Sequence, residues 1–93
     1  MSAERPTAGG LHYERLHRRA QELLSTGALP RKGPTRIFGG FGSCFTCALC
    51  GAPILQSEVE YELLFESADD ENLAYRFHLR CHQIWDYERH RAR

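Results

Sequence analysis

Two pairs of potential metal ligands constrain this 93-residue chain more than any other feature of its sequence. Cys47 and Cys50 are separated by two residues and followed by Gly51, and His78 and Cys81 repeat this spacing further along the chain. A Cys-x-x-Cys-Gly segment predicts a tight turn in which both thiolates face one point and the glycine takes a positive φ. The two pairs form a Cys₃His set, which is typical of closed tetrahedral zinc sites. We therefore expect one structural Zn²⁺ ion bound by Cys47, Cys50, His78 and Cys81.

Cys44 and His82 lie near the two pairs and are alternative candidate ligands. Cys44 precedes Cys47 by three positions, so Cys44, Cys47, Cys50 and Cys81 could instead hold an iron–sulfur cluster. His82 follows Cys81 directly and could replace a ligand, although a contact with a ligand or with solvent is the preferred interpretation. Thiols that are simply buried are the remaining interpretation, and the two paired spacings argue against it.

A chain of this length is expected to need a bound metal ion to stabilise its fold. Ninety-three residues make one small domain, whose core supplies only a few kcal/mol of net stability. Residues 1–10 carry no apolar periodicity and predict a disordered tail. We find no secretory signal and no stretch long enough to span a membrane, so we expect a cytoplasmic protein with reduced thiols and no membrane partner.

The formal net charge is zero, but the charges are unevenly distributed. Residues 1–56 hold seven Lys or Arg and three Asp or Glu, whereas residues 57–93 hold five and nine. An unbroken acidic block predicts a solvated face that nucleic acid would avoid. The block consists of Glu58, Glu60, Glu62, Glu66, Asp69, Asp70 and Glu71.

The N-terminal half predicts one helix and a connector. Apolar residues spaced three to four apart predict an amphipathic helix over residues 11–26, which Gly27 would end; they are Tyr13, Leu16, Ala20, Leu23 and Leu24. Residues 27–43 are rich in glycine and proline and predict a loop that connects the helix to the zinc module. This loop lacks the Gly-Lys-Ser/Thr element of a phosphate-binding loop.

The C-terminal half predicts a hairpin and a second helix within a zinc-binding module of residues 44–93. Residues 59–65 and 74–78 alternate in polarity and predict two strands joined by a polar, acidic loop. Residues 79 to about 90 predict a helix anchored by Ile84, Trp85 and Tyr87, with Trp85 packed in the core. The expected fold is α+β, with an N-terminal amphipathic helix followed by a zinc knuckle, a β-hairpin and a C-terminal helix.

This order of elements resembles a treble-clef zinc finger over residues 44–90. The phrase Phe77-His78-Leu79-Arg80-Cys81 is similar to the Phe-His-x-x-Cys phrase of LIM-type zinc modules. No second zinc module follows, so the partner preferences of LIM proteins do not carry over. The segment Gly27–Pro30 ahead of the glycine-rich stretch also resembles small bacterial proteins, a likeness that implies a fold and no activity.

These features favour a protein-interaction module that uses an apolar or acidic face of the hairpin. The alternative is a nucleic-acid binder that uses basic residues of the N-terminal half, Arg15, Arg18, Arg19, Arg31, Lys32 and Arg36, together with the basic end at Arg89, His90, Arg91 and Arg93. We expect no enzyme, because four protein ligands leave no open position for water on the metal. A redox or iron–sulfur protein is the least favoured reading, and the sequence leaves the oligomeric state open.

Overall fold

The computed structural model describes residues 10–66 and 73–91 as two helices and a three-stranded antiparallel sheet. The elements are α1 (Gly10–Thr26), β1 (Arg36–Phe41), β2 (Val59–Phe65), β3 (Leu73–His78) and α2 (Leu79–Arg91), and the strand order is β1-β2-β3. The expected α+β fold is confirmed. Residues 1–9 of the predicted tail, residues 67–72 of the acidic loop and residues 92–93 lie outside the described residues. The prediction of a tail is wrong for Gly10, which is the first residue of α1.

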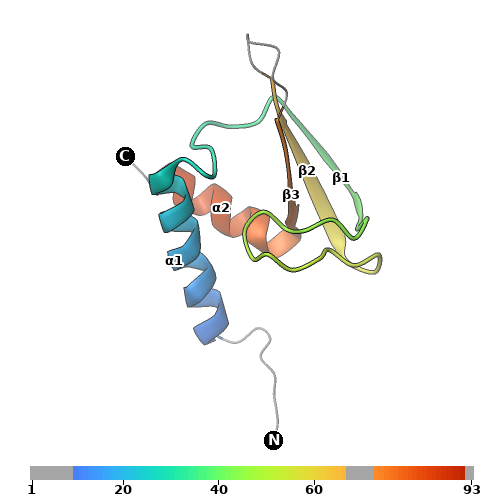
Figure 1. The fold of residues 1–93 in the computed structure, drawn as a ribbon, viewed down its shortest axis with the longest axis horizontal. Coiled ribbons are helices and arrows are strands. Elements are labelled where there is room, and N and C mark those ends of the chain that lie inside the picture. Colours follow the sequence, from blue (N-terminus) through green and yellow to red (C-terminus); the bar gives the residue numbers. More distant parts are fainter. Residues whose placement is uncertain (1–9, 67–72, 92–93) are drawn as a thin grey trace, which may run out of the picture.

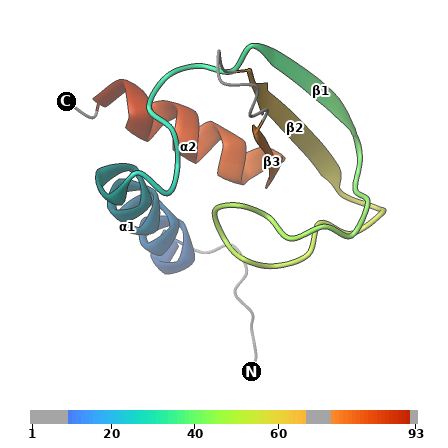
Figure 2. The ribbon, with the colours of Figure 1, turned by 45° about the horizontal axis from the view of Figure 1, so that its top comes forward.

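Helix α2 lies between helix α1 and the sheet. α2 contacts α1 on one side and strands β2 and β3 on the other, and the two views of the ribbon show this order (Figures 1 and 2). The segment between β1 and β2 folds back near the start of α2 (Figure 1) and carries Cys44, Cys47 and Cys50. Neither of the two described helices is long and apolar enough to cross a membrane.

Helix α1 buries one stripe of side chains, as its sequence predicts. Leu16, Ala20 and Leu24 are spaced four residues apart and are almost fully buried. Gly27 ends the helix with a φ of 86°, and its N–H donates to the Leu24 carbonyl at 3.3 Å. Tyr13, which we expected on the buried stripe, is 44% exposed and meets the His17 ring edge-on instead.

The core lies where α2 crosses the hairpin. The rings of Phe77 and Trp85 stack with centroids 5.5 Å apart, and Ile84 and Leu63 are buried beside them. The Trp85 indole N–H donates to the Pro30 carbonyl at 3.0 Å, which ties the chain after α1 to this core. The prediction for Ile84 and Trp85 is therefore confirmed. The prediction that Tyr87 is an apolar anchor is wrong, because its side chain is 54% exposed.

The expectation that residues 27–43 form only a loop is wrong for Arg36–Phe41, which is strand β1 paired with β2. Two glycines explain this difference. A Cβ at Gly39 would lie only 3.0 Å from the Tyr61 ring, and one at Gly42 would overlap the backbone carbonyl of Leu55. Glycine is thus required at Gly42, directly after the strand, whereas a side chain at Gly39 would only displace the Tyr61 ring slightly. Pairing with β2 overrides the low strand propensity of the glycines.

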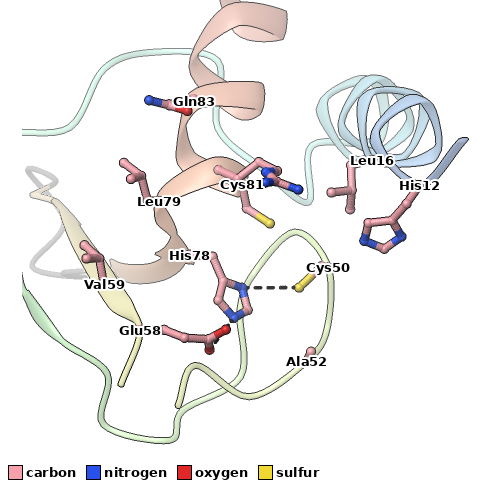
Figure 3. A pocket seen from close by; sticks show the side chains of 11 residues that line it. His12, Leu16, Cys50, Ala52, Glu58, Val59, His78, Leu79, Cys81 and Gln83 are labelled. Atoms are coloured by element: carbon pink, nitrogen blue, oxygen red, sulfur yellow. Dashed lines mark hydrogen bonds and ion pairs between the residues drawn. The ribbon is translucent and has the colours of Figure 1, made fainter. Parts of the chain in front are cut away.

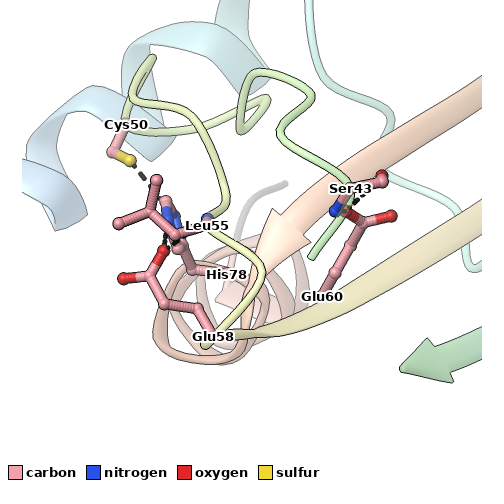
Figure 4. Close-up of polar contacts among 6 residues, drawn as sticks. All are labelled: Ser43, Cys50, Leu55, Glu58, Glu60 and His78. Carbon is pink, nitrogen blue, oxygen red and sulfur yellow. Dashed lines mark hydrogen bonds and ion pairs between the residues drawn. The ribbon is translucent and has the colours of Figure 1, made fainter. Parts of the chain in front are cut away.

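The predicted hairpin is confirmed as β2 and β3, but the acidic residues of β2 are not all solvated. Leu63 is fully buried towards α2, while Glu60 on the opposite face is only 8% exposed. Its carboxylate accepts hydrogen bonds from the N–H and hydroxyl of Ser43 at 3.0 and 2.9 Å (Figure 4). Arg76 of β3 lies 3.4 Å from the same carboxylate. Glu60 therefore holds the chain that leads into the first cysteine pair.

Candidate metal centre

Cys47 and Cys50 lie in the tight turn that their spacing predicts. The turn is closed by backbone hydrogen bonds from the Cys47 N–H to the Ala52 carbonyl at 2.8 Å and from the Gly51 N–H to the Cys47 carbonyl at 3.0 Å. Gly51 has a φ of 82°, which confirms the expectation for this glycine. We call residues 46–53, bounded by a bridge between Thr46 and Pro53, the knuckle.

The second ligand pair lies where β3 passes into α2. His78 is the last residue of β3 and Cys81 lies in the first turn of α2, so the pair spans the junction of the two elements. The knuckle reaches this junction through its backbone, because the Ala48 N–H donates to the Arg76 carbonyl of β3 at 2.7 Å. The two pairs, far apart in sequence, are thereby brought to one place.

The four expected ligands form one compact group. One ligand atom from each of Cys47, Cys50, His78 and Cys81 lies within 4.8 Å of all the others, and Cys47 and Cys81 are buried. Cys50 Sγ and His78 Nδ1 are 3.4 Å apart (Figure 3). A tetrahedral zinc site with bonds of about 2.0–2.3 Å has ligand–ligand distances of about 3.3–3.8 Å. This Cys₃His group could therefore bind a metal ion with little rearrangement.

Glu58 supports the histidine of this group, a role that the sequence did not reveal. His78 turns Nδ1 towards Cys50, and its Nε2 lies 3.2 Å from Glu58 Oε1 (Figure 4). The Glu58 carboxylate also accepts the Leu55 N–H at 2.8 Å, which fixes its position. Metal-bound histidines commonly donate their second ring N–H to a carboxylate in this way. In the sequence, Glu58 was one member of an acidic block and had no distinguishing signal.

The thiols of the group influence one another's ionisation. The pKa of Cys47 lies far below its ordinary value because the thiols of Cys50 and then Cys81 donate hydrogen bonds to it. The same contacts raise the pKa of Cys81 far above its ordinary value, chiefly through Cys47, and Cys47 also raises the pKa of Cys50. Three thiolates at this spacing repel one another, so a bound divalent cation is what would stabilise all of them together.

Cys44 and His82 lie apart from the group. The Cys44 side chain is exposed, and the residue has a φ of 68° while its N–H donates to the Ile54 carbonyl. His82 instead packs its ring against those of Tyr61 and Trp85, and burial lowers its pKa. The four-cysteine set of the iron–sulfur alternative is therefore not assembled.

An open groove of about 680 Å³ adjoins the cluster. It runs between the start of α1, the knuckle and the start of α2, with His12 and Leu16 on one side and Glu58 on the other (Figure 3). Cys50, His78 and Cys81 form part of its wall. One side of the cluster therefore borders the surface, while Cys47 lies within the buried core.

Fold and site together describe an α+β chain with a Cys₃His group that could hold a metal ion. Comparison with protein-family models, with curated proteins and with solved structures finds no match for the chain. The resemblance to treble-clef and LIM modules thus stays a prediction, as does the division of the chain at residue 44.

Proposed function

We propose that the chain binds one structural Zn²⁺ ion through Cys47, Cys50, His78 and Cys81, and that the resulting treble-clef module serves as a protein-interaction module. The observation that carries the metal assignment is the convergence of four ligand atoms within 4.8 Å. The order of knuckle, hairpin and helix, with the second ligand pair at the helix start, supports the treble-clef assignment.

The composition of the group favours zinc over an iron–sulfur cluster. Three thiolates and one imidazole form one of the common tetrahedral donor sets of structural zinc. The imidazole of His78 faces the group, whereas the fourth thiol that a Cys₄ cluster would use, Cys44, is exposed outside it. Glu58 would orient His78 for the metal, as a supporting carboxylate does in other zinc sites.

The proposed role of the ion is structural rather than catalytic. Four protein donors complete a tetrahedral sphere and leave no position for a reactive water, so we propose that the chain is not an enzyme. The ion would join the knuckle to the junction of β3 and α2. Binding at such sites contributes folding free energy on the order of 10 kcal/mol.

Several of the basic residues that would contact nucleic acid already have partners within the chain. The Arg19 guanidinium donates to the Leu49 carbonyl in the knuckle. Arg89 pairs with Asp86 at 2.9 Å, and Arg91 lies over the Tyr87 ring. These contacts hold the three guanidinium groups against the chain itself, and the Asp86 carboxylate offsets the charge of Arg89, which makes the groups less available to a phosphate backbone. We therefore favour a protein partner over nucleic acid.

Metal content measured on purified protein tests the zinc assignment. Elemental analysis is expected to find one zinc per chain in the wild type and none in Cys50→Ser. Cys44→Ser is the matched control, because it removes a thiol outside the cluster. A brown, iron-containing protein, or a folded protein without bound metal, would contradict the proposal.

Salt-dependent binding tests the choice of partner. We expect no DNA or RNA binding that weakens steeply between low and physiological salt, since the chain carries no net positive charge and its acidic block would repel phosphates. A logarithmic binding constant that falls linearly with salt, and that Arg15→Ala and Arg18→Ala both reduce, would show the nucleic-acid alternative to be correct.

A further inference from the structure

Strand β1 is an outer strand whose free edge is left uncovered by the part of the chain that the structure describes. All six of its residues are exposed, including the large apolar side chains Ile37, Phe38 and Phe41 at 52, 49 and 79%. The opposite outer strand, β3, is partly covered, because the knuckle bonds to its Arg76 carbonyl. Both ribbon views show β1 on the side of the sheet away from the helices (Figures 1 and 2).

The backbone of β1 presents unpaired hydrogen-bonding groups along this edge. The Gly42 N–H donates to the Glu58 carbonyl at 2.8 Å, so Gly42 faces β2. Bonding direction alternates along an antiparallel strand, so Phe38 and Gly40 also face β2. Ile37, Gly39 and Phe41 must then direct their N–H and C=O groups outward. Such a row of unpaired N–H and C=O groups can pair with a strand of another chain.

The edge of β1 lacks the residues that normally prevent another strand from pairing with it. Proteins normally guard an outer strand with a lysine, a proline or an inward-pointing charge. The sequence Ile-Phe-Gly-Gly-Phe, residues 37–41, has none of these. An apolar, uncharged edge that is exposed in the monomer fits an interface better than a solvent-facing surface.

We propose that β1 pairs antiparallel with β1 of a second copy of this chain, about a two-fold axis through Gly39. This register sets Ile37 opposite Phe41 of the second copy, and Gly39 opposite Gly39. It matches every outward-facing backbone group between residues 37 and 41 with a partner. Two three-stranded sheets thereby join into one continuous sheet with an isologous interface.

The side chains of β1 are complementary to themselves in this register. Phe38 comes opposite Gly40 of the second copy, and a Cβ placed at Gly40 meets no atom within 4 Å, so space is open there. Within each chain the Tyr61 ring already covers the neighbouring Gly39 in the same manner. Aromatic rings that cover glycines on an adjacent strand are a recognised stabilising pairing in sheets.

The charges also favour a second copy over a charged foreign strand. The formal net charge is zero, so two copies do not repel each other overall. Arg36, the only charged residue of β1, comes opposite the uncharged Gly42 of the second copy. No like charges of the two β1 strands therefore lie opposite each other in this register.

Sedimentation equilibrium over a range of protein concentrations tests the proposal. The wild type is expected to shift from the 10.7 kDa monomer to twice that mass as its concentration rises. Phe41→Lys and Ile37→Lys place a charge in the interface and are each expected to raise the dimer dissociation constant by on the order of tenfold or more. Leu73→Lys, on the exposed part of the opposite outer strand, is the matched control and should leave the constant unchanged.

Amide hydrogen exchange tests the register independently of any substitution. At high concentration the amides of Ile37, Gly39 and Phe41 should gain protection, whereas those of Phe38 and Gly40 are protected at every concentration by β2. Wild-type protein that stays monomeric, or a dimer that Phe41→Lys and Leu73→Lys affect equally, overturns the proposal. Because β1 supplies no candidate ligand, metal content remains one ion per chain in either case, and a failure here is distinct from a failure of the zinc assignment.

Discussion

The knuckle packs against the junction of β3 and α2, and helix α1 packs against α2, but the two are attached by different means. The knuckle brings two cysteines to within 4.8 Å of the ligand atoms of His78 and Cys81, and it buries Leu49, with Ile54 buried directly after it. Helix α1 offers no candidate ligand. It is attached through a stripe of small and aliphatic side chains, Leu16, Ala20 and Leu24.

A polar cluster completes the attachment of α1. The Glu88 side chain of α2 is buried, and its two carboxylate oxygens contact His17 Nδ1 at 2.6 Å and Gln21 Nε2 at 3.3 Å. A helix can supply its own apolar face, whereas a tight turn has little area to bury. We therefore expect the knuckle to depend on the metal ion and α1 to depend on its apolar contacts.

Removal of the metal should have the largest effect. A strong chelator, or Cys81→Ser, is expected to remove folding free energy on the order of 10 kcal/mol and so to unfold residues 44–91. The 17 residues of α1 should then lose their helix too, because an isolated helix of this length is marginal in water. Far-UV circular dichroism measures both losses, with Cys44→Ser as the control. A spectrum that a chelator leaves unchanged would refute the structural role of the ion.

Leu24→Ala should weaken the attachment of α1 by about 2–5 kcal/mol, since it leaves a cavity at a side chain that is almost fully buried. Urea denaturation of the metal-loaded protein measures this change, and Ser25→Ala on the exposed side of the helix serves as the control. The metal content is expected to stay at one ion per chain. If the variant loses the ion as well as stability, the attachment of α1 and the attachment of the knuckle are not independent.

His17→Leu should cost about 1–3 kcal/mol, because it takes a hydrogen-bond partner from the buried Glu88 carboxylate. The double variant His17→Leu/Glu88→Leu removes both partners and should be less destabilised than the single one. Arg18→Ala, an exposed neighbour on α1, should change stability by less than about 0.5 kcal/mol. If the double variant is the least stable of the three, the contact between His17 and Glu88 is not what holds the helix there.

Glu58→Gln should have the smallest effect on folding and a specific effect on metal affinity. The change weakens the contact that orients His78, and loss of such contacts typically lowers metal affinity about 10- to 100-fold. Competition with a chromophoric chelator measures the affinity, with the exposed Glu66→Gln as the control. Equal affinities for the two variants would assign Glu58 only to the turn at Leu55.

The sequence alone predicts the four residues of the candidate metal site, the knuckle, the hairpin and both helices. These features depend on short-range patterns: the Cys-x-x-Cys-Gly turn at residues 47–51, the alternation at 59–65, and the apolar stripe that includes Leu16 and Leu24. Each pattern acts within a few residues, so a single chain displays it directly. The convergence of the Cys₃His group followed from combining these local elements.

The contacts between segments that are distant in sequence could be identified only from the folded structure. Strand β1 was missed because glycine disfavours strands, whereas the fold places the Tyr61 ring beside Gly39 and the Leu55 carbonyl against Gly42. Glu58 and Glu60 looked like solvated acids until the fold set them against His78 and Ser43. Contacts between residues that are far apart in sequence leave no periodic signal, since either partner alone is an ordinary polar residue or glycine.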